Sequence, residues 1–354
     1  MTVAWQDAVN VSDFERLAAE RMEAGAYGYY AGGAGDERTM RDNVDAYARR
    51  RLRPRVLVEG LPASTATTVL GTPVSMPLLV APTALQRLAH PDAEPAMARA
   101  AAGAGTIFCL STLATSRPSE VVTDGPRWFQ LYVFRDRAVT RALLDEALGH
   151  GFGAVVVTVD AAVAGRRERD ERTGFTIPPD IDMPAVRAAL GTLECPTPAE
   201  FFSLVNGNLG WRDIEQLASE LPVPLLLKGI QTAEDAALAC EHGVAGIVVS
   251  NHGGRQLDGV AATIDMLPEV VEAVDGRIEV LVDGGVRRGT DALVALALGA
   301  RAVLVGRPPL WGLAAGGEHG ARRVLDLLQE EIARGLSLLG AAAPSAVTRA
   351  HVAR

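Results

Sequence analysis

The sequence predicts an α/β protein whose fold is a (β/α)8 TIM barrel. Three observations lead to this prediction: eight short apolar runs rich in β-branched residues, helical periodicity between them, and polar residues where the runs end. Continuous apolar runs are typical of strands buried on both faces of a parallel sheet. Eight βα units favour a closed barrel, although a two-lobed α/β protein would give a similar string. The expected strands are Leu78–Pro82, Thr106–Ser111, Trp128–Val133, Ala154–Asp160, Pro224–Gly229, Gly246–His252, Glu279–Gly285 and Ala302–Pro308.

The segments between these strands are long enough for crossover helices. Clear helical periodicity is found in Ala138–His150, Ala233–His242, Thr263–Val274 and Gly289–Leu298. We expect residues 1–354 to form a single domain, since barrels of this class reach about 250 residues and more with insertions. Residues 1–60 are expected to form an N-terminal helical cap, 78–310 to hold the barrel strands, and 311–354 to form a C-terminal helical segment.

One connection is longer than the others. Residues 175–210 lie between the fourth and fifth strands and are rich in proline: Pro178, Pro179, Pro184, Pro196 and Pro198. A long irregular connection of this kind is usually a functional lid. We therefore predict a long loop after strand four that gates the substrate.

Composition argues against several classes of protein. The net charge is −9, which disfavours a nucleic-acid binder because phosphate contacts need a basic face. The nearest basic cluster is expected to be a solvated or ion-paired surface: Arg49, Arg50, Arg51, Arg53 and Arg55. No apolar run approaches the roughly 20 residues that cross a bilayer, and the N-terminus lacks the pattern of a signal peptide. We expect a cytoplasmic protein without a membrane partner.

The three cysteines, Cys109, Cys195 and Cys240, have no C-x-x-C spacing. One of them stays unpaired under any single disulfide. This usage indicates a reducing compartment and predicts no metal site.

Polar and ionisable residues stand where each predicted strand ends. Because the C-terminal strand ends of a (β/α)8 barrel line its active site, this distribution is expected for catalysis and unnecessary for stability. The residues are Thr83, Ser111, Gln130, Tyr132, Thr158, Asp160, Lys228, Ser250, His252, Asp283 and Arg307.

Two motifs after the last two strands predict a phosphate cradle. They are V-D-G-G-V-R (Val282–Arg287) and V-G-R-P (Val305–Pro308). Glycine lets backbone N–H groups approach phosphate oxygens, and arginine supplies a charge-assisted bidentate contact. Either motif alone could be a simple turn, so the prediction rests on their pairing.

A third motif, S-N-H-G-G-R-Q-L-D, places His252 three residues before Arg255. Histidine is the side chain best suited to take a proton near neutral pH, and arginine is the natural partner of a carboxylate. In W-F-Q-L-Y-V, Gln130 and Tyr132 share one side of a strand, as Thr158 and Asp160 do in T-V-D, because strand side chains alternate. Asp160 could orient a facing histidine and make it more basic.

With these residues in view, the chain resembles the FMN-dependent 2-hydroxy acid oxidase and dehydrogenase family, which includes glycolate oxidase, lactate oxidase and mandelate dehydrogenase. The resemblance covers nearly the whole chain. It is carried by Y-Y-A-G-G-A-G-D-E, P-T-A-L-Q-R-L-A-H-P-D-A-E, W-F-Q-L-Y-V, G-R-R-E-R-D, L-L-K-G-I, S-N-H-G-G-R-Q-L-D, D-G-G-V-R-R-G-T-D and L-G-A-R-A-V-L-V-G-R-P.

The resemblance implies roles for individual residues. His252 would be the catalytic base, assisted by Asp160, and Tyr132 would bond the reacting oxygen. The substrate carboxylate would lie between Tyr29, Arg167 and Arg255. Lys228 would stand beside the flavin. The other residues implied to bind FMN are Thr83, Ala84, Ser111, Gln130, Thr158 and Ser250 around its ring system, and Asp283, Gly285, Arg287, Gly306 and Arg307 around its phosphate.

The implied reaction is oxidation of a small (S)-2-hydroxy acid to the 2-oxo acid, with electrons passing from FMN to oxygen. Ala84 is similar to the residue of the oxidases, whereas dehydrogenases of the family more often carry glycine there. A non-oxygen acceptor and a specialised hydroxy acid of secondary metabolism stay open. Members are commonly tetramers, so the resemblance also implies a homotetramer.

One segment departs from the family pattern. After Asp160 the family usually continues T-P-R-L-G, whereas this chain has four apolar residues, Ala161 to Ala164, before Gly165. This change bears on the loop that presents Arg167. Leu113 stands where some relatives place a tryptophan against the substrate, which indicates a roomier pocket.

Two other functions share part of this pattern. An FMN barrel that isomerises a phosphorylated substrate would share the phosphate cradle but would not need His252, Arg255 and Arg167 together. A flavin-binding protein without turnover is disfavoured because each predicted catalytic position holds a competent residue.

Overall fold

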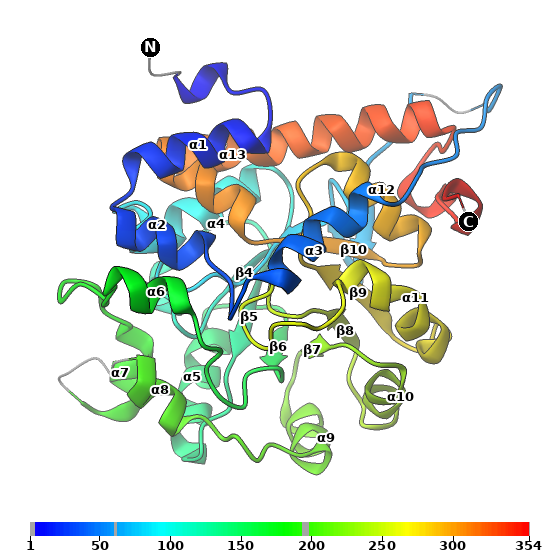
Figure 1. Ribbon diagram of the computed structural model, residues 1–354. Helices are drawn as coiled ribbons and strands as arrows, with labels where there is room; N and C mark the ends of the chain where they lie inside the picture. Colours follow the sequence, from blue (N-terminus) through cyan, green and yellow to red (C-terminus); the bar gives the residue numbers. More distant parts are fainter. Residues whose placement is uncertain (1–3, 60–61, 193–197, 354) are drawn as a thin grey trace.

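The computed structural model describes residues 4–59, 62–192 and 198–353. Eight parallel strands form a closed barrel in the order β10-β3-β4-β5-β6-β7-β8-β9, which confirms the predicted (β/α)8 fold (Figure 1). Strand β7 (Leu225–Ile230) is shifted by one residue from its predicted run. The other strands are shorter than predicted: β3 (Leu78–Val80), β4 (Phe108–Leu110), β5 (Arg127–Leu131), β6 (Val155–Thr158), β8 (Gly246–Val249), β9 (Glu279–Asp283) and β10 (Ala302–Val305).

Helices surround the barrel and follow its strands in chain order. They are α4 (Ala93–Gly103), α5 (Arg137–Gly149), α9 (Trp211–Glu220), α10 (Ala233–Glu241), α11 (Thr263–Val274), α12 (Gly289–Ala297) and α13 (Arg307–Leu339). The four helices expected from periodicity are found within one residue of their predicted bounds. Helix α13 is kinked at Gly316 and Gly317, whose backbone angles are not helical.

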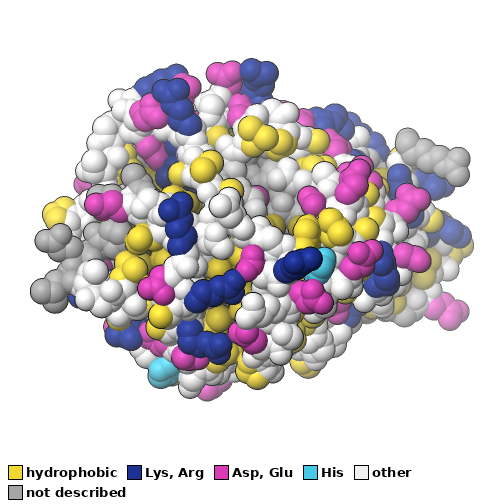
Figure 2. Space-filling model, turned by 90° about the horizontal axis from the view of Figure 1, so that it is seen from below, with side chains coloured by type: hydrophobic (Ala, Val, Ile, Leu, Met, Phe, Trp, Pro, Cys, Tyr) yellow, Lys and Arg dark blue, Asp and Glu magenta, His cyan; other side chains and the backbone are white. Residues whose placement is uncertain are grey.

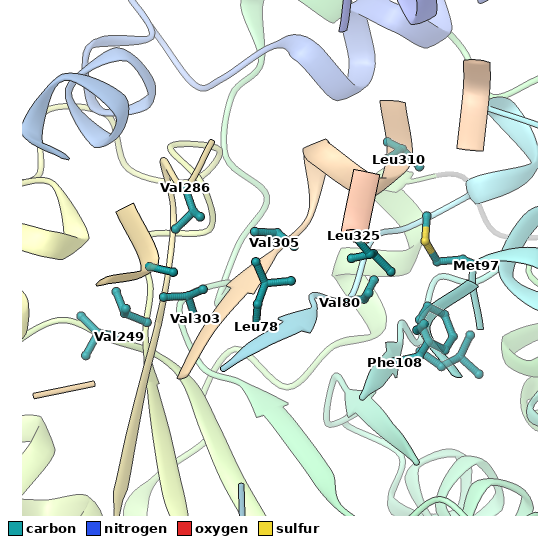
Figure 3. Packing of buried hydrophobic residues seen from close by; sticks show 14 of the residues in the cluster. Leu78, Val80, Met97, Phe108, Val249, Val286, Val303, Val305, Leu310 and Leu325 are labelled. Atoms are coloured by element: carbon teal, nitrogen blue, oxygen red, sulfur yellow. The ribbon is translucent and has the colours of Figure 1, made fainter. Parts of the chain in front are cut away.

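Strand residues alternate between two apolar layers, as period-two geometry requires. Leu78 and Val80 of β3 and Val303 and Val305 of β10 face outward toward the helices, where Leu325 of α13 packs (Figure 3). The other strand positions fill the barrel interior as a second cluster: Leu79, Ala81, Ile107, Cys109, Trp128, Ala154, Val156, Leu226, Val248, Leu281, Ala302 and Leu304. Burial on both faces explains why the strands read as continuous apolar runs.

A hairpin that the sequence analysis did not predict adds to the interior cluster. Strands β1 (Thr67–Val69) and β2 (Thr72–Val74) pair antiparallel, and Leu70 and Gly71 make the turn with positive φ angles of 46° and 74°. Val69 and Val74 pack with the interior residues of the barrel. With its floor filled by side chains, the barrel is a packed core, and its ligand site has to lie at its mouth.

The N-terminal segment holds helices α1 (Val11–Arg21), α2 (Ala24–Ala31) and α3 (Arg38–Ala48). Figure 1 shows α1 running beside α13, and α3 lying close to the labels of β9 and β10. Asn43 of α3 exchanges two side-chain hydrogen bonds of 2.9 Å with Asn251, just after β8. This amide pair fixes α3 to the barrel loop that carries His252.

The connection between β6 and β7 differs from the predicted irregular loop. It contains α6 (Glu168–Thr173), α7 (Pro184–Leu190) and α8 (Pro198–Leu204), while Pro196 lies outside the described residues. Pro184 occupies the first turn of α7. Proline is favoured there because its φ angle already suits a helix and its missing N–H is not needed. Reading every proline as a loop residue was therefore wrong for this segment.

The remaining short elements are 3-10 turns: η1 (Trp5–Asp7), η2 (Gln86–Leu88), η3 (Pro118–Glu120), η4 (Pro344–Ala346) and η5 (Arg349–His351). No helix in the described part of the chain is long and apolar enough to cross a membrane. On the face shown in Figure 2, basic and acidic side chains are interspersed, without a broad basic area.

The basic cluster at residues 49–55 is held by its neighbours. Arg49 pairs with Asp42 at 2.7 Å and with Asp265 at 3.0 Å, and Arg50 also pairs with Asp265. This is the ion-paired surface that the sequence analysis expected.

Candidate active site

A cleft of about 1360 Å³, counting its open mouth, lies at the C-terminal ends of the barrel strands. The cleft brings together residues predicted from all eight strand ends, two loops and helix α2. Its walls contain Tyr29, Thr83, Ala84, Ser111, Gln130, Tyr132, Thr158, Arg167, Lys228, His252, Arg255, Asp283, Gly285, Arg287, Gly306 and Arg307. Asp160 and Ser250 lie directly behind this wall, where they contact His252 and Lys228.

The first pair in the cleft is His252 and Asp160. Nδ1 of His252 lies 2.9 Å from Oδ1 of Asp160, and the aspartate side chain is 4% exposed against 26% for the histidine. Burial alone would raise the pKa of Asp160, but the charges of His252 and Lys228 and the hydrogen bond to His252 hold it below its usual value. A carboxylate on Nδ1 leaves Nε2 free to face the cleft and act as a base.

The backbone is shaped to bring this pair together. His252 has a φ angle of 58°, which is uncommon for a residue other than glycine, and its N–H donates to Oγ of Ser250 at 3.1 Å. Gly229 interrupts the β7–β8 register with a φ angle of 116°. A Cβ atom on Gly229 would lie 2.6 Å from Cβ of Asp160, so only glycine leaves room for the aspartate.

Two arginines flank Tyr29 at one side of the cleft. The guanidinium carbons of Arg167 and Arg255 each lie 5.0 Å from the centre of its ring. Arg167 pairs with Asp170 at 2.8 Å, whereas Arg255 donates to the carbonyl oxygens of Tyr29 and Gly32. Burial, and then the charge of Arg167, lower the pKa of Arg255. Such an arrangement has an excess of positive charge, which an incoming carboxylate would neutralise.

The rest of this end of the cleft is largely apolar and aromatic. Burial, and then the charge of Asp160, raise the pKa of Tyr132, so its phenol keeps its proton and can donate a hydrogen bond. The Tyr132 ring makes edge contacts with Phe201 and Phe202, at centroid distances of 5.6 and 5.9 Å. Side chains from the β6–β7 connection and the β4 loop complete the wall: Leu113, Ile177, Met183, Phe201 and Phe202. Neither phenylalanine was predicted, because the segment was read as an irregular loop.

A strip of side-chain hydrogen bonds crosses the barrel mouth. Ser111 donates to Oε1 of Gln130 at 3.2 Å, and Nε2 of Gln130 donates to Oγ1 of Thr158 at 2.9 Å. These three residues come from adjacent strand ends, as the sequence analysis expected. They offer polar atoms to one face of a ligand above the barrel core.

Lys228 is buried beside two side-chain oxygen atoms. Its Nζ lies 3.1 Å from Oδ2 of Asp283 and donates to Oγ of Ser250 at 2.9 Å. Burial alone would lower the pKa of Lys228, but Asp283 and Asp160 raise it above its usual value. The ammonium therefore stays charged, next to the cleft, throughout the neutral pH range.

The predicted phosphate cradle contains two half-buried arginines, Arg287 and Arg307, without a carboxylate bound to either guanidinium in the described residues. Arg307 donates to the carbonyl oxygens of Tyr30, Gly32 and Gly253. Burial, and then repulsion from Arg255 and Arg287, lower the pKa of Arg307 to about 9. Burial also lowers the pKa of Arg287. Charges partly buried in this way favour a bound anion.

Glycine is required in the same cradle. Gly285 has a φ angle of 85°, and a Cβ atom there would collide with the backbone carbonyl of Asn43. Gly284 has a φ angle of 92°. Both glycines also line the cleft, where a backbone without side chains suits an approach to phosphate oxygens.

Sequence reasoning missed two residues that hold the site together. Glu94, fully buried, accepts hydrogen bonds from Gln86 N–H, Thr115 N–H and the hydroxyls of Thr115 and Ser116. It thereby joins the loops that follow β3 and β4. Gln256 is the second residue; its side chain donates a hydrogen bond to the backbone carbonyl oxygen of Asp160. The only available signal for Glu94 was its place in P-D-A-E beside the predicted site.

The comparisons with known proteins agree with this geometry. A family model described as FMN-dependent dehydrogenase matches residues 18–354. An L-lactate oxidase from a Nostoc species is 48% identical over 94% of both chains. The glycolate oxidase of Spinacia oleracea is 45% identical over 98% of this chain and 96% of its own.

The chain belongs to the FMN-dependent dehydrogenase family. Solved structures of this family superimpose closely on it. A mandelate oxidase with (S)-mandelic acid gives a TM-score of 0.89 at 40% identity and covers 98% of each chain. An active chimera of (S)-mandelate dehydrogenase gives a TM-score of 0.90 at 36% identity, over 98% of this chain and 99% of the other.

The residues of the cleft fit the cofactor that gives this family its name. The phosphate of FMN matches the half-buried arginines and the glycine turn, and its flat ring system matches the strip of polar atoms across the barrel mouth. Oδ1 of Asp283 is buried without a hydrogen-bond partner in the described residues, as expected of an atom that accepts a hydrogen bond from a bound ligand. FMN is therefore the cofactor of this family member, and Lys228 lines the cleft where it would offer a cation to the bound flavin.

No group of three or more His, Cys, Asp and Glu side chains in the described residues is arranged to hold a metal ion.

Proposed function

We propose that this enzyme oxidises an (S)-2-hydroxy acid to the 2-oxo acid and reduces oxygen to hydrogen peroxide. The observation that carries the proposal is one cleft in which the His252–Asp160 pair, the two arginines around Tyr29 and the FMN residues meet. Relatives that share 45–48% identity are named lactate and glycolate oxidases.

The arginines are proposed to bind and orient the substrate carboxylate. Arg255 is half-buried and is held by two backbone carbonyl oxygens, so its guanidinium is fixed before the substrate arrives. Arg167 also lines the cleft, against the same Tyr29 ring. Fixing the carboxylate at one end leaves the 2-hydroxyl within reach of Tyr132 and His252, since all of these side chains line the same cleft.

His252 is proposed to take the proton of the 2-hydroxyl group on Nε2. Asp160 then stabilises the imidazolium through the 2.9 Å contact at Nδ1. The Tyr132 hydroxyl, kept protonated by burial, donates a hydrogen bond to the same substrate oxygen. When bound, FMN accepts the two electrons and the α-hydrogen of the substrate and delivers the electrons to oxygen. Lys228 holds a fixed positive charge where negative charge develops.

The substrate is proposed to carry an apolar side chain. The apolar part of the cleft wall consists of Leu113, Ile177, Met183, Phe201 and Phe202, which offer dispersion contacts and no charge. Substrates in the size range from lactate to mandelate fit this chemistry, because aromatic rings favour edge-to-face packing on Phe201 and Phe202. Glycolate, which has no side chain, would leave these contacts unused.

Oxygen is the proposed acceptor. Ala84 lines the cleft next to Thr83, at the end of β3, and the family resemblance associates alanine at this position with oxidases. The alternative is a dehydrogenase that passes electrons to another acceptor.

The enzyme is further proposed to be a cytoplasmic homotetramer. The compartment is supported by Cys109 and Cys240, which are both free thiols. Association is supported by Val56 and Leu57, which are 80% and 101% exposed and adjacent in the chain. Light scattering of the purified protein measures the assembly: a tetramer mass supports the proposal, and a monomer mass rejects it.

The activity is tested by oxygen uptake and peroxide formation with glycolate, L-lactate, (S)-mandelate and longer-chain 2-hydroxy acids. We expect equal amounts of oxygen consumed and peroxide formed, with the highest kcat/KM on an acid with an apolar side chain. Turnover with an artificial acceptor but without oxygen uptake would instead favour the dehydrogenase alternative. If glycolate were the best substrate, the proposal of an apolar side chain would be rejected, while the proposed oxidase activity would stand.

A further inference from the structure

Gln256 binds three backbone groups of a single loop. Its Oε1 accepts a hydrogen bond from the N–H of Gly165 at 2.9 Å. Its Nε2 donates to the carbonyl oxygen of Asp160 at 3.0 Å and to that of Val163 at 3.1 Å. One side-chain amide thus satisfies the start, middle and end of the segment 160–165.

This loop carries a catalytic group at one end and leads to a binding group at the other. Asp160 begins the loop and contacts His252, while Arg167 follows it by two residues. Gln256 is attached to the facing loop, next to Arg255. Its amide therefore links the two loops that supply the proposed base pair and both carboxylate-binding arginines.

Apart from Ala161, which is buried in the hydrophobic core, the loop has few other restraints. Between Asp160 and Gly165 the side chains are three alanines and one valine, and Val163 is 74% exposed. The sequence lacks the proline found in the family pattern at this point, so the backbone is free to sample more conformations. Gly165 packs so closely on the facing loop that a Cβ atom would collide with the carbonyl of Arg255 and lie 2.7 Å from Cα of Gln256. The loop therefore packs directly against Gln256.

We propose that Gln256 is a positioning residue that sets Asp160 and Arg167 in their working geometry. The proposal rests on the proposed function, because it assigns these two residues their catalytic and binding tasks. It predicts that loss of the amide lowers turnover through Asp160 and weakens acid binding through Arg167, while FMN stays bound. Misplacement of about 1 Å at a reacting group costs on the order of a hundredfold in rate.

Two variants separate positioning from general stability. Gln256→Leu removes all three hydrogen bonds. Gln256→Glu has nearly the same shape and still accepts from Gly165, but its carboxylate faces two carbonyl oxygens and cannot donate. A protonated glutamic acid regains one donor. The pKa of a glutamate is about 4.3 in water and rises when the carboxylate faces carbonyl oxygens without a donor, so the donor returns at mildly acidic pH.

The test measures kcat, KM and the binding of the 2-oxo acid product for each holoenzyme between pH 5.5 and 8. Each value of a variant is divided by the wild-type value at the same pH. The nearby charged groups are Asp160, Arg166 and Arg167 on the facing loop and His252, Arg255 and Asp258 on the same loop. Division by the wild-type value removes their titration, since both enzymes contain them. Gln216→Leu on exposed α9 is the matched control and is expected to equal wild type.

At pH 8 we expect kcat/KM per bound flavin to fall about ten- to a hundredfold in both variants, with weaker product binding. The Gln256→Glu ratio to wild type should rise severalfold toward pH 5.5, while the Gln256→Leu ratio stays flat. If Gln256→Leu does not fold, the Gln256→Glu profile decides alone. Full activity per flavin in the variants, or a flat Gln256→Glu profile, would overturn the inference. Failure of the wild-type enzyme to oxidise any acid would instead reject the proposed function.

Discussion

Nδ1 of His252 lies 2.9 Å from Oδ1 of Asp160, at the ends of two strands that are 92 residues apart in the chain. The contact depends on a left-handed backbone at His252 and on the missing side chain of Gly229. The left-handed backbone at His252 carries a conformational cost that a purely structural ion pair would not need. Its presence at the mouth of the barrel supports a catalytic use of this pair.

The carboxylate-binding role of Arg167 predicts a change in substrate selectivity. Arg167→Met should lower kcat/KM for a 2-hydroxy acid by about 10- to 150-fold, the equivalent of a charged hydrogen bond of about 1.5–3 kcal/mol. The uncharged 2-hydroxy amide should be affected far less. Arg166→Met is the matched control, because Arg166 is exposed and pairs with Glu171. Equal losses for acid and amide would contradict the assignment.

The phosphate cradle predicts a cofactor-selective defect. Arg287→Gln should weaken FMN binding to the apoprotein about 10- to 150-fold, by loss of one charged contact, and should leave the binding of riboflavin nearly unchanged. Arg288→Gln is the control, since Arg288 pairs with Glu331 on α13. Fluorescence titration of both flavins measures the difference. A parallel loss of riboflavin binding would show that Arg287 supports the fold instead of the phosphate.

The pKa of Asp160 predicts a pH-dependent contribution to stability. Because the folded protein holds this pKa below its usual value of 3.8, the carboxylate stabilises the fold above pH 3.8. That contribution is lost as the pH falls through the lowered pKa. The stability difference between wild type and Asp160→Asn should therefore shrink as the pH falls below 3.8. Urea unfolding of the holoenzymes at several pH values measures it, and a difference independent of pH down to 2.5 would reject the prediction.

The glycine turn of the cradle predicts unequal costs for two alanine substitutions. Gly276 and Gly285 have similar φ angles of 71° and 85°. A Cβ atom on Gly276 meets nothing within 4 Å, whereas one on Gly285 collides with the carbonyl of Asn43. Gly276→Ala should cost about 1–2 kcal/mol of unfolding free energy. Gly285→Ala should cost more and release FMN; equal melting temperatures and flavin contents would contradict this.

The barrel and the chemistry at its mouth could be predicted, because both depend on short, local sequence patterns. Strand runs such as A-V-V-V-T-V-D mark buried strands, and the polar residue that ends each run has to lie at the mouth. Hairpin β1–β2 was missed because T-T-V and T-P-V are too short to stand out. Helix α7 was missed because Pro184 was read as a loop residue, although it begins the helix.

The positioning contacts could not be predicted for a different reason. Gln256 and its three partners are separated by 91 to 96 residues, and Glu94 and its partners by 8 to 22. A glutamine or glutamate inside a motif does not reveal which backbone groups it will meet. Such contacts appear only when the strand ends are assembled around the barrel.

The most direct test of the account is anaerobic mixing of the purified holoenzyme with a panel of 2-hydroxy acids, followed by admission of air, with the flavin absorbance recorded throughout. We predict that an acid with an apolar side chain bleaches the flavin and that oxygen restores it rapidly. His252→Gln should retain FMN and bleach about a hundred- to ten-thousandfold more slowly, since a general base contributes this much to the rate. Bleaching of His252→Gln at the wild-type rate, or bound FMN that no acid in the panel bleaches, would contradict the account.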